Sequence, residues 1–192
     1  MIGIIPNQLI TKHIIEPVTV VNNCFSPSTT LDQLKIVVIE RHKGTGKIGV
    51  GIVKGFGLKS GAIATTIAHD SHNIIVSGIN DKDIITAIEV IKNMQGGMVV
   101  IHDGEVLSSI PLNIAGLMSE ECAEVVYTNL VEVNKSLQVL GATTMFNPFL
   151  MMSFLSLPVI PNVKMTTDGL FDVTNFKHIP VGLSNICPKI PS

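Results

Sequence analysis

The fold of this chain is decided by a run of apolar residues, Leu34-Lys35-Ile36-Val37-Val38-Ile39-Glu40. Its four consecutive β-branched side chains leave no polar face, which is typical of a strand buried on both sides of a sheet. Three further stretches have strand-like composition: the glycine-dense Gly46–Phe56, the small-residue Ala62–Ala68 and the short Ile74–Ser77. The sequence therefore predicts a β-sheet with an apolar centre.

Two helices are indicated by apolar residues at intervals of three and four. The first is capped by Asn80 or Asp81 and stops at Gly96-Gly97. The second is predicted from Ser119 to Gly141. Its apolar stripe, expected to be one buried face, consists of Cys122, Val126, Leu130, Val133, Leu137 and Leu140.

Two dipeptides of hairpin type, Asp103-Gly104 and Asp168-Gly169, predict tight turns between strands. With the first of these turns, the order strand, strand, helix occurs twice, at about residues 62–95 and 98–140. The fold class is therefore α/β (α+β): a two-layer mixed β-sheet with helices mainly on one face, built from two strand–strand–helix units.

The chain length of 192 residues indicates one domain. Residues 1–30 are expected to form a short extended segment ahead of the core, residues 31–181 the domain itself, and residues 182–192 a tail. Pro6, Pro17 and the turn-rich Ser26–Thr29 interrupt the first segment, so it is predicted not to be a core unit.

Charge and composition exclude several classes of partner. A formal charge of −2 gives no electrostatic reason to expect a nucleic acid or a membrane surface. The uncharged stretch Gln138–Val163 is divided by prolines, and its longest piece, Phe149–Leu157, is too short to span a membrane and is predicted to be a buried helix. Charged residues make up only 15% of the chain, which favours a face packed on another domain or on a second subunit of a homo-oligomer.

Cys24, Cys122 and Cys187 are isolated and odd in number, so neither a zinc ribbon nor a disulfide framework is expected. The cysteine pattern favours a reducing, cytoplasmic compartment.

One polar segment, His69-Asp70-Ser71-His72-Asn73, directly follows a strand of small residues. Strand ends in α/β folds often expose functional side chains, and imidazole with carboxylate can bind a metal or transfer protons. A metal site would need a further ligand from His42, His102 or Asp103, so no residue is assigned as a metal ligand. The alternative is a polar turn whose side chains bridge neighbouring strands.

Gly44–Gly49 matches the pattern GxGxxG, but an alternating, β-like stretch follows it instead of a helix. The dinucleotide-binding fingerprint therefore fails on context. Glycines at this spacing favour the close approach of two backbones, or of a backbone and a ligand. Arg41, His42 and Lys43 beside them form a basic cluster, which makes either surface salt bridges or contacts to an anionic or carbonyl-bearing ligand.

Five blocks of the sequence resemble a known family, the C-terminal domain of the bacterial and archaeal adenine deaminases of the amidohydrolase superfamily. The resemblance runs from about residue 2 to about residue 181. The blocks are Ile2–Gln8; Arg41-His42 with Gly46–Gly51 and Val53–Leu58; Gly61–Ala64 with Ala68–Ile74; Pro111-Leu112 with Ile114–Ser119; and Ser153–Pro161.

The resemblance implies part of a hydrolase that converts adenine to hypoxanthine and ammonia. In the family, manganese or iron is held by a (β/α)₈ barrel that precedes this domain and carries an HxH motif. No HxH occurs in this chain, and a barrel alone takes about 250 residues, so this polypeptide is expected to be a partial or truncated chain without its own cofactor.

The resemblance also suggests roles for the polar segments. His69, Asp70 and His72 are the catalytic candidates, and Ser71, Asn73, Arg41 and His42 are the candidates for adenine binding. The expected partner is an amidohydrolase barrel domain or subunit, with the isolated chain inactive. Two alternatives remain: a non-catalytic module that binds a purine or another small ligand or regulates a partner, and a structural, oligomerising domain.

Overall fold

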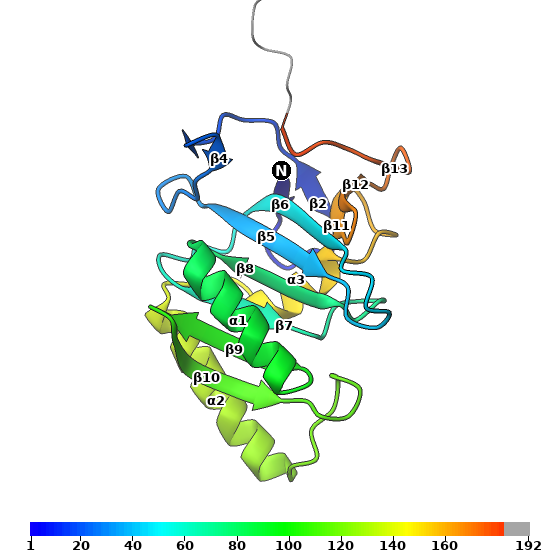
Figure 1. Ribbon diagram of the computed structural model, residues 1–192. Helices are drawn as coiled ribbons and strands as arrows, with labels where there is room; N and C mark the ends of the chain where they lie inside the picture. The colour runs from blue at the N-terminus through cyan, green and yellow to red at the C-terminus, as the bar shows by residue number, and fades with distance from the viewer. Residues whose placement is uncertain (183–192) are drawn as a thin grey trace, which may run out of the picture.

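The computed structural model describes residues 1–182 and is built around one eight-stranded sheet with strand order β10-β9-β7-β8-β5-β6-β1-β2 (Figure 1). Those strands are β1 (Ile2–Ile4), β2 (Thr11–His13), β5 (Gln33–Ile39), β6 (Ile48–Lys54), β7 (Ala62–Thr65), β8 (Ile74–Gly78), β9 (Gly97–His102) and β10 (Glu105–Pro111). The remaining elements are β3 (Val20–Val21), β4 (Cys24–Phe25), α1 (Asp81–Asn93), α2 (Ala123–Val139), α3 (Pro148–Leu155), β11 (Val163–Thr166), β12 (Gly169–Asp172) and β13 (Lys177–His178).

The predicted mixed sheet with helices packed on it is confirmed. β1 pairs with β6 in parallel, and the other neighbouring strands of the large sheet pair antiparallel. Both predicted hairpins form, with Asp103-Gly104 between β9 and β10 and Asp168 in the turn between β11 and β12. β7, β8 and nearly all of β9 are buried, as expected for strands covered on both faces.

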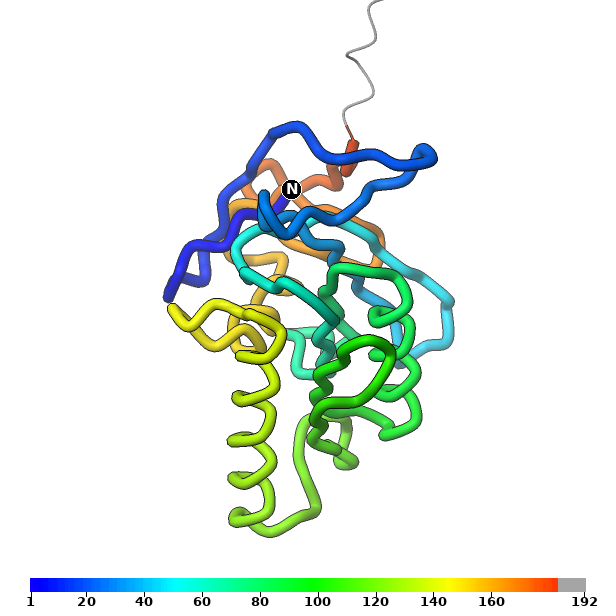
Figure 2. Tube along the Cα trace, turned by 90° about the vertical axis from the view of Figure 1, so that its left-hand side faces the viewer, coloured from blue at the N-terminus to red at the C-terminus, as the bar shows by residue number. Residues whose placement is uncertain are grey.

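The two strand–strand–helix units place their helices on opposite faces of the sheet, which the sequence did not predict. α1 packs on the face that carries Val76 and Val99, whereas α2 and α3 pack on the face that carries Ile75 and Val100. Figure 2 shows α1 and α2 on either side of the strands. The second face also receives the small sheet of β11, β12 and β13. The physical reason is that the central strands are apolar on both sides, so each side needs a cover.

The start of the second helix was predicted wrongly. α2 begins at Ala123 with Cys122 as its N-cap, because Ser119 instead accepts a hydrogen bond from the amide of Glu121 in a preceding turn. Only the C-terminal half of the expected stripe is buried: Val133 is 1% exposed, whereas Leu130 is 38% exposed. α1, by contrast, begins as expected, with the side chain of Asn80 accepting from the Asp83 amide.

Residues 1–30 are extended, as expected, but they do not lie outside the core. β1 is an inner strand of the large sheet, and Ile2 is fully buried. The fully buried Lys164 of β11 donates from Nζ to the carbonyl oxygen of Leu9 at 2.7 Å, which ties this segment to the small sheet. Long-range pairing of this kind leaves no signal in a short stretch of sequence.

The uncharged stretch near the C-terminus forms the buried helix α3, as predicted. Among residues 1–182, no helix is both long and apolar enough to cross a membrane. The predicted tail, residues 182–192, lies outside the described residues except for its first residue.

Candidate functional site

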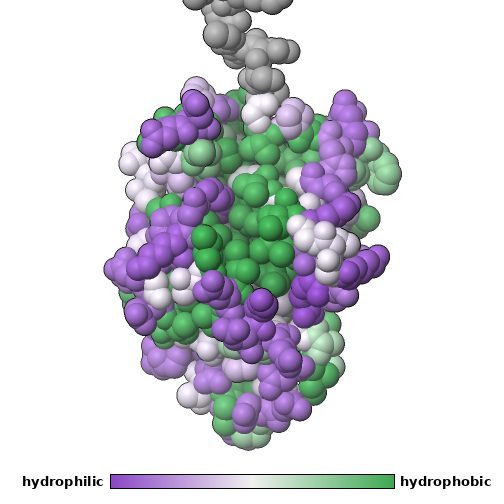
Figure 3. All heavy atoms as spheres, in the orientation of Figure 1, coloured by the Kyte–Doolittle hydropathy of each residue, from purple (hydrophilic) through white to green (hydrophobic). Residues whose placement is uncertain are grey.

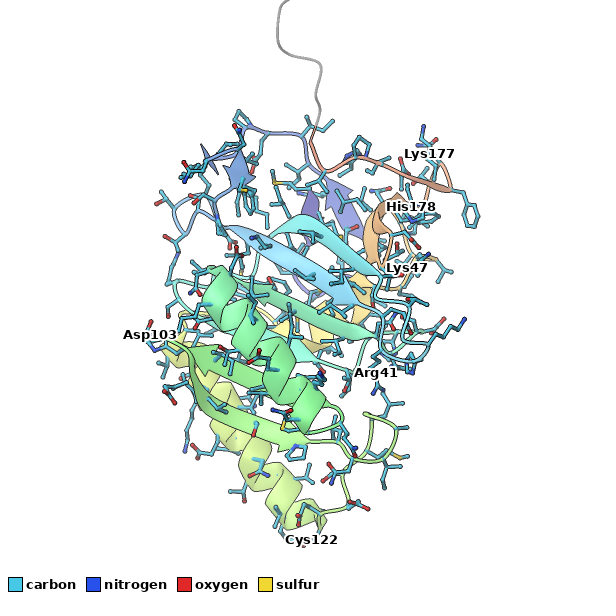
Figure 4. The ribbon with its side chains drawn as sticks, in the orientation of Figure 1. Arg41, Lys47, Asp103, Cys122, Lys177 and His178 are labelled. Atoms are coloured by element: carbon cyan, nitrogen blue, oxygen red, sulfur yellow. The ribbon has the colours of Figure 1, made fainter. Side chains whose placement is uncertain are left out.

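Three loops meet at one end of the large sheet: residues 40–47 between β5 and β6, residues 66–73 between β7 and β8, and the turn around Ala115. Their proximity follows from register, because Ile39 at the end of β5 faces both Ile48 and Ile74. Figure 4 shows Arg41 and Lys47 at this end and Asp103 at the opposite end. The two predicted polar segments are therefore brought together.

Arg41 joins the three loops through main-chain carbonyl groups. Its Nε donates to the carbonyl oxygen of His72 at 2.6 Å, and its Nη2 donates to the carbonyl oxygen of Ala115. Its own amide donates to Oδ1 of Asn73 at 3.3 Å. Burial lowers the pKa of the guanidinium. This residue, a candidate for adenine binding, has its guanidinium engaged by the protein itself.

Glu40 shapes the basic loop, and sequence reasoning missed it. One carboxylate oxygen accepts from the amides of His42 at 2.6 Å and Lys43 at 2.7 Å, and the other accepts from the amide of Thr45 at 3.1 Å. These bonds, that of Thr45 foremost, lower the pKa of Glu40 to about 2. An acidic residue just before a glycine-rich loop was the available signal.

The loop that Glu40 shapes lies on the histidine-containing segment. Nε2 of His42 is 2.7 Å from the carbonyl oxygen of Ser71 and donates to it. Among the glycines of this region, Gly49 confirms the predicted close backbone approach, because a Cβ atom there would lie 2.0 Å from the carbonyl oxygen of Thr166. The last glycine of the GxGxxG pattern thus serves packing, whereas Gly44 and Gly46 have positive φ in open space and serve the turn of the loop.

His69 and His72 lie in an edge-to-face arrangement with ring centroids 5.5 Å apart. The ring of His69 also packs on Phe154 at 4.7 Å, and its amide donates to the carbonyl oxygen of Ser153 at 2.8 Å. His72 has a left-handed backbone with φ of 49°. Burial, followed by the nearby His69, lowers the pKa of His72 and favours its neutral form.

Asn73 and Ser71 partly fulfil the alternative prediction, a polar turn whose side chains bridge neighbouring strands. Asn73 is 8% exposed, and its Nδ2 donates to the hydroxyl of Ser71 at 3.2 Å while its Oδ1 holds the Arg41 amide. Its polar atoms therefore bridge β8 to the loop after β5.

A cavity of about 430 Å³ opens beside this segment. Its polar lining consists of Asp70, Ser71, Asn73, Ser156, Thr166 and Thr167, and its apolar lining of Val38, Pro158, Val159 and Met165. A smaller cavity of about 220 Å³ is lined by His69 and by residues that include Met98 and Phe149. The larger volume is in the range of small-molecule sites.

The residues gathered here do not fit a metal centre. Nδ1 of His72 faces the amide of Ala68 at 3.4 Å, and Nε2 of His42 faces a carbonyl oxygen, so these two nitrogens have protein partners. His102 and Asp103, considered as further ligands, lie at the opposite end of the sheet, because β9 runs antiparallel to β7. Within the described residues 1–182, no three His, Cys, Asp or Glu side chains are close enough to hold a metal ion.

Comparison with known proteins places this domain in context. The family model described as adenine deaminase C-terminal domain matches residues 8–177. The chain is 54% identical over 93% of its length to an adenine deaminase of Halalkalibacterium halodurans and 55% identical over 93% to one of Bacillus subtilis. It is 48% identical over 95% to a protein named adenine deaminase 2 of Carboxydothermus hydrogenoformans. The matched region spans 31–32% of the length of these relatives.

Proposed function

The chain belongs to the adenine deaminase C-terminal domain family, and from this we propose that it forms the C-terminal part of an enzyme that hydrolyses adenine to hypoxanthine and ammonia. The identity of more than half with curated adenine deaminases over nearly the whole chain supports the proposal. Adenine is then the substrate of the complete enzyme, which acts in purine catabolism.

The nucleophile for this reaction is a water molecule activated by a metal ion, which we propose to be manganese or iron held by an amidohydrolase barrel outside this chain. The proposed partner is that barrel, as a preceding domain or as a subunit, and the relatives are long enough to include one. The residues of this chain would then bind and position the purine and exclude water.

The observation that carries the proposal is the cavity beside residues 69–73. Its polar lining supplies a carboxylate from Asp70, which only accepts hydrogen bonds, together with hydroxyl and amide groups that both donate and accept. An aminopurine needs this combination, because its amino group donates and its ring nitrogens accept. We therefore propose that the domain covers the barrel mouth and presents Asp70, Ser71 and Asn73 to the purine.

In this arrangement Arg41 and His42 hold the 69–73 segment in place by donating to the carbonyl oxygens of His72 and Ser71. The lowered pKa of His72 favours its neutral form, and because Nδ1 accepts from the Ala68 amide, Nε2 carries the ring proton and can donate a hydrogen bond. The proposed compartment is the cytoplasm, because the exposed Cys24 and Cys122 are free thiols.

A second candidate is a purine-binding or regulatory module without turnover, favoured by the same cavity. Calorimetry with adenine on the chain alone tests it. Tight binding of adenine without a barrel would support the binding module. Absence of binding would exclude it and leave two hypotheses, a part of an enzyme or a structural domain.

The proposal is tested in a chimaera in which this chain replaces the matching C-terminal region of the Bacillus subtilis relative. Asp70→Asn is expected to raise the KM for adenine or lower kcat about tenfold, which is the loss of one hydrogen bond to a charged group. His69→Ala and His72→Ala are expected to act in the same direction by loosening the segment that carries Asp70. Asp103→Asn at the far end of the sheet is the control. Unchanged kcat and KM in all three variants, with unchanged melting curves, would remove the proposed role.

A further inference from the structure

One face of the large sheet is only partly covered by the described residues. α1 packs over β7, β8 and β9, but the same face of β5 and β6 has no helix above it (Figure 1). Val50 of β6 lies opposite Val37 of β5, and Ile48 lies opposite Ile39. Ile48 is 57% exposed and Val50 is 46% exposed. We call these four residues, with Ile85 of α1, the β5–β6 face.

The β5–β6 face is apolar and continuous. Figure 3 shows hydrophobic side chains gathered over β5 and β6 beside α1, bordered by hydrophilic ones. Ile85 on α1 is 55% exposed and follows by one helical turn Asp81, which pairs with Lys35 of β5. Scattered apolar residues are ordinary on a surface, but a contiguous patch with a polar border is typical of an interaction site.

The face meets the candidate site only at the loop 40–47, because Val38 lines the cavity whereas Val37, on the β5–β6 face, points to the other side of the sheet. Ile39 and Ile48 are the two residues that flank the loop 40–47, and that loop carries Arg41 and His42 onto the 69–73 segment. A partner seated on the β5–β6 face would therefore contact the loop that holds the cavity lining in place.

The relatives indicate which partner this is. About two thirds of each relative lies outside the matched region, and the family is that of a C-terminal domain, so that remainder precedes it. A covalently linked partner is present at an effective concentration of about millimolar, which favours it over a free second copy.

We infer that the β5–β6 face is the surface on which the N-terminal, metal-bearing part of adenine deaminase docks. The inference rests on the proposed function for the identity of the partner. Docking there covers the exposed Ile48 and Val50 and fixes the loop 40–47 at the rim of the interface.

Cysteine labelling tests the docking without reference to activity. Val50→Cys is placed in a background with Cys24→Ser, Cys122→Ser and Cys187→Ser, in the chain alone and in the chimaera with the Bacillus subtilis relative, whose own cysteines are replaced. The rate of reaction with a maleimide is measured in both. Val21→Cys on β3, whose native side chain is 54% exposed, is the matched control. Ile48→Cys is a second reporter on the β5–β6 face.

The expected result is labelling of Val50→Cys and Ile48→Cys at least about tenfold slower in the chimaera than in the chain alone, with Val21→Cys equal in both. Equal rates for all three would overturn the inference. The inference would also be overturned if the chain alone were labelled slowly, at a rate that depends on the chain concentration, since a second copy would then cover the face. Faster labelling after deletion of residues 183–192 would assign the face to that segment and also overturn it.

The two proposals fail separately. A chimaera that deaminates adenine but labels freely at Val50→Cys contradicts only the docking surface. A chimaera that is protected at this position but insensitive to Asp70→Asn, His69→Ala and His72→Ala contradicts only the role of the cavity.

Discussion

The Nε of Arg41 donates a hydrogen bond to the carbonyl oxygen of His72 across 2.6 Å, joining two loops that are 31 residues apart in sequence. The same guanidinium reaches the carbonyl oxygen of Ala115. Because both acceptors are main-chain atoms, one side chain fixes the backbone of the loop at His72 and of the turn at Ala115. The geometry of the candidate cavity depends on this bridge.

Arg41→Lys is expected to destabilise the chain by about 2 kcal/mol. An ammonium on a flexible stem cannot span two carbonyl oxygens in the plane that a guanidinium fits. The free energy of unfolding in urea measures the change. Lys43→Met, which removes a neighbouring exposed charge, should stay within about 0.5 kcal/mol. Equal effects of the two substitutions would contradict the role given to Arg41.

Glu40→Ala is expected to speed amide hydrogen exchange at His42, Lys43 and Thr45, whose amides bind its carboxylate. In the native chain, the pKa of about 2 keeps Glu40 ionised at pH 4, so these amides should remain protected there and lose protection only as the pH approaches 2. NMR-detected hydrogen exchange of the native chain and of Glu40→Ala at pH 4, and of the native chain as the pH is lowered toward 2, measures both effects. Glu132→Ala on α2 should leave these three amides unchanged.

His72→Asn is expected to reduce the loss of stability in mild acid. The pKa of His72 is lowered in the folded chain by burial and by His69, so the unfolded chain binds a proton first as the pH falls below 6.5, and stability is lost. Asparagine accepts the left-handed backbone at this position and does not titrate. Urea unfolding at pH 7.5 and 5.5 gives the comparison, and parallel losses in both proteins would exclude His72 as the cause.

Lys164→Met is expected to alter the alkaline side of the stability profile. Burial lowers the pKa of Lys164 from 10.5 to about 8, so as the pH rises from 8 to 10.5 the native chain should gain about 3 kcal/mol relative to the variant. Below pH 8, Lys164 is protonated in both the folded and the unfolded native chain. The difference in the free energy of unfolding between the native chain and the variant should therefore be constant there. Urea unfolding at pH 7, 9 and 10.5 measures it, with Lys135→Met as an exposed control.

Features governed by local chemistry could be predicted from the sequence. The β-branched run became a central strand, Asn80 capped α1, and Asp103-Gly104 and Asp168-Gly169 formed hairpin turns. Each of these depends on residues a few positions apart. The 69–73 segment was identified because five polar residues follow an apolar strand.

Features that depend on distant backbone could not be predicted. The parallel pairing of β1 with β6 joins residues about 50 positions apart, and it placed Ile2 in the core. The acceptors of Arg41 are carbonyl oxygens, which every residue carries, so no residue type marks them. The exposed half of α2 has an apolar stripe like that of its buried half, and only the extent of the sheet distinguishes them.

The central claim, that this chain supports the hydrolysis of adenine and does not perform it, is tested most directly by ammonia release from adenine in the presence of Mn²⁺ or Fe²⁺. We predict release by the chimaera with the Bacillus subtilis relative and none by the 192-residue chain alone. Catalytic release of ammonia by the chain alone would contradict the account.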